Sequence, residues 1–260
     1  MSAQFPDEGV RVEPREEGAV WHVFLDAPKA NILDARMVGS LRAVFRLAAE
    51  TPDLKAVCLE GTGPHFSFGA SVEEHQPERV AEMLGSFHGL FRDMAASAVF
   101  VVAALRGQCL GGGLELAAFA HRMIAAPDTK LGQPEIRLGV IAPAASVILP
   151  QRMGRPGAED LCISGRVIGA DEARTMGLVD EVAEDPTDAA LGYVRANLLP
   201  HSAASLRRAV RAIRLSFDRR LHDDLDAVER LYLDDLMACD DAVEGIGAFL
   251  EKRKPVWKNA

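Results

Sequence analysis

Two glutamates in this chain stand in local settings that favour acid–base chemistry. Glu115 follows three consecutive glycines, residues 111–113, and lies among good helix formers. Glu135 follows Pro134, which pins the backbone of a glycine-bounded loop at residues 132–139. A pair of carboxyl groups divides the acid and base roles when their surroundings separate the two pKa values. The pair is therefore a candidate for moving protons on a bound substrate.

The glycine triplet also suits the binding of negative charge. Residues 99–105 form an apolar run typical of a buried strand, so the local order is strand, glycine turn and helix. Glycine lets a ligand approach peptide N–H groups that no Cβ shields, and N–H groups at a helix N-terminus favour negative charge. Taken alone, the same pattern is also typical of a plain packing turn.

A second glycine loop precedes another expected helix start. It contains Gly69 and Ala70, and the next residue, Ser71, has the spacing of a capping box with Glu74. Its backbone N–H groups are therefore also expected at a helix N-terminus.

Composition excludes several classes of partner. The 260 residues are 48% hydrophobic and 26% charged, which predicts a globular protein with one full-sized core. A net charge of -9 argues against nucleic acid, since phosphate binding relies on a cationic surface. No secretory signal and no run of ~20 apolar residues is found, so we expect a cytoplasmic protein with no membrane partner. The cysteines and histidines lack ligand spacing, so we expect no metal site.

The elements that must position these loops alternate between strand and helix. The apolar patterns predict strands at 20–25, 55–60, 99–105 and 122–126, and helices from about 34 to 48, from 78 to 96 and from 114 onward. From about residue 197 the pattern is helical only. We therefore expect an α/β fold in two parts, a core at residues 1–196 with the active site and a helical region at residues 197–260.

The motifs together resemble those of the enoyl-CoA hydratase/isomerase, or crotonase, superfamily. Residues 107–117, GQCLGGGLELA, are similar to the family signature. Further similar segments are FGAS at 68–71 for the first oxyanion loop, GQPE at 132–135 with LG at 138–139 for the second glutamate, ISGR through GLV at 163–179, and FLEKR at 249–253. The resemblance covers nearly the whole chain in the family's order.

The resemblance implies a fold and a set of roles. The fold is a spiral of strand-strand-helix repeats, with a C-terminal helical region that forms a trimer or a dimer of trimers. The backbone N–H groups of Ala70 and Gly112 form an oxyanion hole for the thioester carbonyl of an acyl-CoA, Glu115 activates water and Glu135 delivers the proton. Implied contacts to substrate or coenzyme A are Lys29, Ala30, Gly69, Ser71, Gly111, Ala142, Pro143 and Lys252. No cofactor is implied, because coenzyme A is part of the substrate.

Segments beside the two glutamates indicate the substrate. Residues 138–146, LGVIAPAAS, and 69–75, GASVEEH, resemble the cyclohexa-1,5-diene-1-carbonyl-CoA hydratases of anaerobic benzoyl-CoA degradation, and His75 falls close enough to the first loop for a role in the pocket. The alternatives are a straight-chain enoyl-CoA hydratase, an isomerase, for which the second glutamate is superfluous, and an acyl-CoA-binding protein without turnover.

Overall fold

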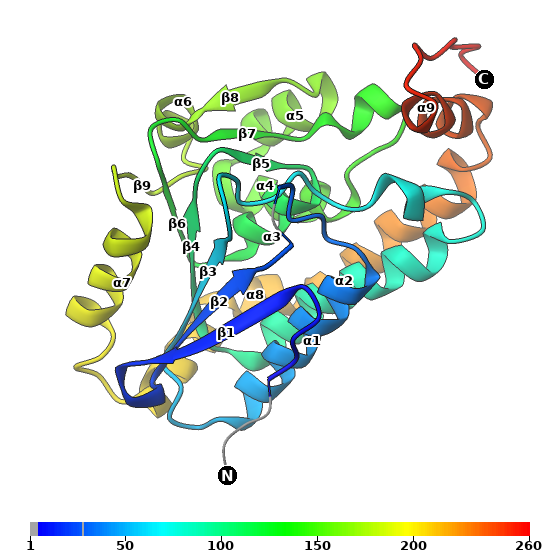
Figure 1. Ribbon diagram of the computed structural model, residues 1–260. Coiled ribbons are helices and arrows are strands. Elements are labelled where there is room, and N and C mark those ends of the chain that lie inside the picture. Colours follow the sequence, from blue (N-terminus) through cyan, green and yellow to red (C-terminus); the bar gives the residue numbers. More distant parts are fainter. Residues whose placement is uncertain (1–4, 28) are drawn as a thin grey trace.

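A six-stranded sheet forms the centre of the molecule in the computed structural model, which describes residues 5–27 and 29–260 (Figure 1). Its strands, in spatial order, are β1 (Val10–Arg15), β2 (Val20–Leu25), β3 (Ala56–Gly61), β4 (Phe100–Leu105), β6 (Arg122–Ala125) and β9 (Glu181–Val182). Neighbours are parallel except β1 and β2. A second sheet joins β5 (Gln108–Leu110), β7 (Lys130–Gly132) and β8 (Val167–Gly169).

Helices cover both sheets and make up the C-terminal part. They are α1 (Ala35–Glu50), α2 (Val80–Ser97), α3 (Gly112–Phe119), α4 (Pro143–Met153), α5 (Arg155–Ser164), α6 (Ala170–Thr175), α7 (Pro186–Asn197), α8 (Ala203–Arg230) and α9 (Asp240–Leu250). Single turns of 3₁₀-helix occur at Glu16–Gly18, Val72–His75 and Pro134–Leu138, and a π-helical turn at Leu231–Leu236 continues α8. Across the described residues no helix is both long and apolar enough to cross a bilayer.

The uninterrupted apolar run of β4 is explained by burial on both faces of the sheet. Val101, Ala103 and Leu105 face the main core, whereas Val102 and Ala104 face a smaller cluster under α7. A parallel strand covered on both sides needs no polar positions, so it reads as a continuous apolar run. By contrast, β1 is an antiparallel edge strand that the sequence did not predict, because only every second residue is apolar and Pro14 interrupts it.

The chain passes from a strand of the large sheet to a strand of the small sheet and then into a helix. This order confirms the expected spiral of strand-strand-helix units. The clearest unit is β4, β5 and α3. Isolated bridges from Ser67 to Cys109 and from Leu33 to Ala70 attach the first glycine loop to the same layer. The two glycine loops therefore lie at one edge of the small sheet, although about forty residues separate them in the sequence.

The predicted capping box at Ser71 is wrong. The Ser71 side chain makes no capping hydrogen bond, and residues Val72–His75 form a 3₁₀ turn instead of opening a longer helix. The Glu74 carboxylate accepts a hydrogen bond from the backbone N–H of Ala35 at 3.2 Å. Ala35 begins α1, whose first N–H groups lack partners within the helix and so attract the carboxylate.

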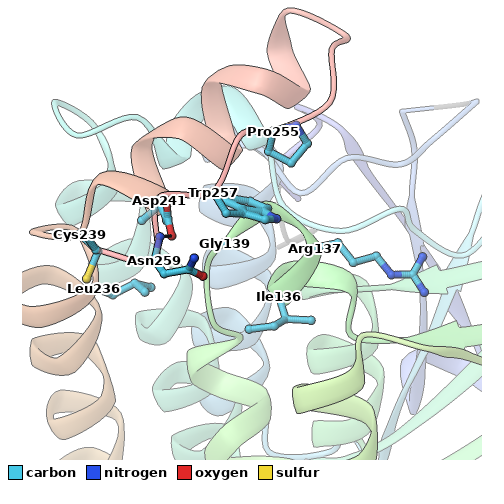
Figure 2. Close-up of a pocket in the computed structure, with 11 residues that line it drawn as sticks. Ile136, Arg137, Gly139, Leu236, Cys239, Asp241, Pro255, Trp257 and Asn259 are labelled. Carbon is cyan, nitrogen blue, oxygen red and sulfur yellow. Dashed lines mark hydrogen bonds between the residues drawn. The ribbon is translucent and has the colours of Figure 1, made fainter.

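The C-terminal residues fold back over the 3₁₀ turn Pro134–Leu138, which we call the Glu135 turn. Both carboxylate oxygens of Asp241 accept backbone N–H groups, from Lys258 and Asn259, at 2.7 Å each. Figure 2 shows Trp257 lying beside Gly139, at the end of the Glu135 turn, in a hollow of about 580 Å³. The close packing of α9 against the Glu135 turn depends on Gly245 of α9, because a Cβ there would stand 2.0 Å from the carbonyl oxygen of Leu138.

Gly245→Ala is therefore expected to destabilise the protein by about 1–3 kcal/mol, because the added methyl group overpacks α9 against the Glu135 turn. Gly247→Ala is the matched control on the same helix, because a Cβ at that position meets no atom within 4 Å. Alanine there is expected to be neutral or to stabilise by up to about 1 kcal/mol through helix propensity. Urea unfolding of both variants measures the difference, and equal stabilities would contradict the close approach.

Candidate active site

A cavity of about 770 Å³ lies where the two glycine loops, the start of α3 and the Glu135 turn meet. Its lining is largely apolar with a few converging polar groups, as is typical of small-molecule sites. Most of the residues proposed from the sequence line it, namely Ala30, Gly69, Ala70, Ser71, Gly111, Gly112, Glu115, Glu135 and Pro143. The structure thus brings into one cavity residues that are spread over more than one hundred positions of the chain.

Three residues proposed from the sequence lie outside this lining. Lys29 and Lys252 are exposed, each with a positive φ, of 96° and 55° respectively. Lys29 adjoins the lining residue Ala30, and Lys252 follows Leu250, which also lines the cavity. Ala142 is buried behind the wall. Coenzyme A contacts for the two lysines stay predictions.

Glu115 is held in the interior by a helix that is buried all round. Every residue of α3 is buried, and Glu115 is only 4% exposed. Its Oε1 accepts a hydrogen bond of 2.6 Å from the backbone N–H of Ala145, in the first turn of α4. That N–H has no partner within its own helix, and the helix dipole favours a carboxylate there. The segment at residues 138–146 therefore orients a glutamate.

The Glu135 carboxylate lies so close to Gly111 that no larger residue would fit at position 111. A Cβ on Gly111 would lie 2.7 Å from Oε1 of Glu135, and Gly111 has a φ of 52°, which suits glycine. The buried Gln133, with its amide nitrogen facing Glu135, donates to both carboxylate oxygens at 3.1 Å. The backbone N–H of Gly111 donates to the carbonyl of Gly132 at 3.0 Å, which ties the triplet to the segment that carries Glu135.

Burial shifts the pKa of both glutamates upward. It raises the pKa of Glu115 to about 7, against the opposing effect of the backbone N–H groups of Ala145 and Ala144. Burial also raises the pKa of Glu135 to about 8, and the negative charge of Glu115 adds to that rise. The two carboxyl groups therefore lose their protons one after the other near neutral pH, as an acid–base pair requires.

The raised pKa values predict a stability that falls as the pH rises. A carboxyl group whose pKa is above its ordinary value in the folded state favours folding when protonated. This contribution is complete below the ordinary pKa of 4.5 and is lost as the pH rises through about 7 to 8. The free energy of unfolding, measured in urea between pH 5 and 8.5, should decline in the wild type. The decline should be shallower in Glu115→Gln, and an unchanged slope would contradict the assignment.

Two backbone amides face the cavity beside the glutamates. A Cβ on Gly112 would lie 3.1 Å from the backbone nitrogen of Ala70, so the two peptide groups are close neighbours. Within the described part of the chain neither N–H donates a hydrogen bond. Gly112 is the first residue of α3, where the helix dipole adds positive potential. Gly69 permits the approach, because its φ is 108° and a Cβ would lie 2.9 Å from the carbonyl oxygen of Leu110.

Apolar side chains from α2 and α9 complete the wall. They include Met83, Leu84 and Phe87 of α2, which a helical stripe marks as core without revealing that they border a cavity. They also include Phe249 and Leu250 of α9, which the sequence placed only in the FLEKR segment similar to the family. Gln133 was also missed as a positioning residue, although it stands inside the GQPE motif. Its place two residues before Glu135 in that motif was the available signal.

Comparisons with known proteins show the family to which the chain belongs. The family model for enoyl-CoA hydratase/isomerase matches residues 15–260. The chain is 52% identical to a cyclohexa-1,5-dienecarbonyl-CoA hydratase of Thauera aromatica, over 96% of this chain and 97% of that protein. It is 33% identical to a probable enoyl-CoA hydratase of Mycobacterium bovis, over 90% and 92%. The crystal structure of an enoyl-CoA hydratase from Mycobacterium avium subsp. paratuberculosis superposes with a TM-score of 0.83 at 26% identity, over 96% and 98%.

The fold, the cavity and the relatives lead to one assignment. A family match over nearly the whole chain, with relatives named as hydratases of acyl-CoA thioesters, identifies the type of reaction. The chain belongs to the enoyl-CoA hydratase/isomerase family, the crotonase superfamily, and is a hydro-lyase that acts on an acyl-CoA.

Proposed function

We propose that this enzyme hydrates cyclohexa-1,5-diene-1-carbonyl-CoA to 6-hydroxycyclohex-1-ene-1-carbonyl-CoA. The observation that carries the proposal is that the buried Glu115, the partly buried Glu135 and the backbone amides of Ala70 and Gly112 converge on one apolar cavity. The relative of 52% identity, whose name specifies this diene, supports the choice of substrate. A straight-chain enoyl-CoA is the second candidate, supported by the relatives of about 33% identity that are named only as enoyl-CoA hydratases.

The amides of Ala70 and Gly112 hold the thioester carbonyl. Attack of water on a conjugated thioester moves negative charge onto the carbonyl oxygen and forms an enolate. Two N–H donors aimed at that oxygen stabilise the developing charge, and the dipole of α3 adds to the effect. The adjoining lining residues Gly69, Ser71 and Gly111 shape this end of the cavity around the thioester.

The two glutamates divide the proton transfers. Glu115, as the carboxylate, takes a proton from water as the oxygen attacks the β-carbon, and the N–H of Ala145 holds the carboxylate in place. Glu135, in its protonated form, delivers a proton to the substrate carbon, and Gln133 orients it. For a straight-chain enoyl-CoA that carbon is the α-carbon. Hydration involves no net oxidation, so the proposed reaction needs no cofactor.

Atom balance for the cyclic diene sends the proton to a different carbon. Hydroxide adds to C2, and the electron pair of the C1–C2 double bond enters an enolate conjugated with the C5–C6 double bond. Protonation at C5 then leaves the double bond between C1 and C6, which is 6-hydroxycyclohex-1-ene-1-carbonyl-CoA once the ring is renumbered. Glu135 must therefore reach across the ring, and the shape of residues 140–146, with Pro143 on the lining, governs whether it does.

The proposal includes coenzyme A contacts and an assembly. Lys29 and Ala30 contact the adenine and phosphates, and Lys252 reaches the coenzyme in its own subunit or in a neighbour. The helical region forms a trimer or a dimer of trimers, which would cover the apolar Ile213 and Leu215 of α8, 83% and 58% exposed in the single chain.

Rates of hydration on the cyclic dienoyl-CoA and on crotonyl-CoA test the proposal directly. We expect kcat/KM to be higher for the cyclic substrate, with 6-hydroxycyclohex-1-ene-1-carbonyl-CoA as the product identified by mass and NMR. Faster turnover of crotonyl-CoA would favour the straight-chain candidate. Binding of both thioesters without turnover would reveal an acyl-CoA-binding protein, and double-bond migration without uptake of water would reveal an isomerase.

A further inference from the structure

The two glutamates of the proposed mechanism differ in how their backbones are supported. Glu115 belongs to α3, an α-helix buried all round, whereas Glu135 belongs to a short 3₁₀ turn in which no residue is fully buried. The N–H groups of Gly139 and Val140 close that turn by donating to the carbonyls of Ile136 and Glu135, at 3.1 and 3.3 Å. A 3₁₀ stretch has poorer hydrogen-bond geometry than an α-helix. The position of the Glu135 carboxyl group therefore depends on what packs against the turn.

Part of that packing comes from residues 253–260, which we call the C-terminal strap. Two carboxylates of α9 hold it in place. Glu244 accepts a hydrogen bond of 2.8 Å from the backbone N–H of Val256 and pairs with Arg253, and Asp241 accepts two further strap N–H groups. The hydrogen bonds from Arg253 lower the pKa of Glu244 to about 2, so this attachment keeps its charge near neutral pH.

Trp257 is the strap residue that meets the Glu135 turn. A Cβ on Gly139 would lie 3.1 Å from Cζ3 of the indole, and a Cβ on Gly245 of α9 would lie 2.9 Å from its Cη2. Figure 2 shows the indole against the end of the turn. The same Cβ on Gly139 would lie 2.7 Å from the carbonyl oxygen of Asp241. The end of the turn is therefore enclosed between α9 and the indole.

The indole contacts the turn from outside the cavity. Trp257 is not among the lining residues, whereas Glu135, Arg137, Leu138 and Val140 all belong to the lining. A substrate in the cavity therefore meets the turn and not the indole, so any effect of Trp257 on the reaction passes through the turn.

We propose that Trp257 is a positioning residue for hydration: held by the C-terminal strap, it braces the Glu135 turn and fixes where the Glu135 carboxyl group meets the substrate. A misplacement of about 1 Å, caused by a change far from the reacting atoms, can cost about 10²-fold in rate. This inference rests on the proposed function in taking Glu135 as the proton donor. It does not depend on whether the acyl group is a ring or a straight chain.

The test is a double-mutant cycle between Trp257 and Glu135, measured on the thioester that the wild type hydrates faster. Trp257→Ala should lower kcat by about 10- to 100-fold and leave KM within about threefold, because the turn shifts while the binding contacts stay. In the Glu135→Gln background the same substitution should change kcat by no more than about twofold, because no carboxyl proton remains to be placed. An equal loss in both backgrounds would overturn the proposal, since a merely structural role lowers activity whichever residue stands at position 135. A change confined to KM would overturn it as well.

Val256→Ala is the matched control within the strap. Val256 is 72% exposed, and alanine keeps the backbone N–H that bonds Glu244. It should leave kcat within about twofold of the wild type, as is usual for an exposed side chain, and a loss as large as that of Trp257→Ala would contradict a specific role for the indole.

Trp257→Phe enters the same cycle if the alanine variant folds poorly in urea unfolding. Phenylalanine keeps an aromatic ring but lacks the outer ring atoms that meet Gly139 and Gly245, so the same dependence on Glu135 is expected. Failure of the proposed function stays distinguishable, because Glu135→Gln alone would then keep near-wild-type hydration.

Discussion

Glu115→Gln and Glu135→Gln should each lower kcat for hydration by about 10²- to 10⁴-fold, the usual contribution of general acid–base catalysis. Glutamine keeps the shape and the hydrogen-bonding oxygen, so the N–H of Ala145 still has its acceptor, but it neither takes nor gives a proton. In the proposed mechanism the two carboxyl groups serve the same hydration reaction. The double variant should therefore lose little more than either single variant.

Stability separates loss of chemistry from loss of folding in these variants. Burial disfavours the ionised form of both glutamates, so each glutamine variant should be at least as stable as the wild type at pH 8. Glu74→Gln is the matched control, because Glu74 is buried in the neighbouring loop and bonds Ala35, away from the cavity lining. It should keep hydration within about twofold of the wild type, as expected when no reacting atom is touched. Near-wild-type hydration by both Glu115→Gln and Glu135→Gln would refute the assigned roles.

Gly112→Pro should lower kcat by about 10²- to 10³-fold, the typical cost of one lost oxyanion donor. Proline removes the N–H, and the helix tolerates the change because Gly112 is the first residue of α3 and its own N–H is not needed inside the helix. The measurement is the kcat for hydration, with the circular dichroism of each variant as a check on folding.

Gly112→Ala provides the steric control for that experiment. Alanine keeps the N–H but places a Cβ 3.1 Å from both the nitrogen of Ala70 and the ring of Phe87. Its loss of activity measures crowding alone, and proline should be at least tenfold worse than alanine if donation by the N–H carries the effect. Equal losses for the two variants would show that the loops need space at this position and that the amide of Gly112 is no donor.

The sequence predicted the elements well where local chemistry decides the backbone. The helix predicted from about residue 34 begins there, because Asp34 caps α1 by accepting from the N–H of Met37 at 2.9 Å. The continuous apolar run of β4 correctly predicts a buried strand. Prediction from the sequence was wrong where a polar side chain had more than one available hydrogen-bond partner. Glu74 has the spacing to cap its own turn, but it binds the start of α1, which only folding brings within reach.

The residues of the candidate site show the same difference between positions that the sequence predicts and positions that it does not. Glycines 69 and 111 reveal the loops from sequence, because the positive φ angles and close approaches found there exclude larger residues. Lys29 and Lys252 show the limit of this reasoning. Each belongs to a segment similar to the family, yet neither side chain lines the cavity of the single chain, because side-chain direction depends on packing and assembly.

The sequence by itself identified the candidate site residues, through glycines, a proline and two glutamates at spacings that impose local backbone geometry. Only the tertiary structure decided how these residues are placed and surrounded. The N–H of Ala145 reaches Glu115 across thirty positions of the chain, and burial in the folded protein raises both pKa values. The physical reason is that burial and electrostatic fields depend on every segment packed around a group, whereas turn and helix propensities depend on its neighbours in the chain.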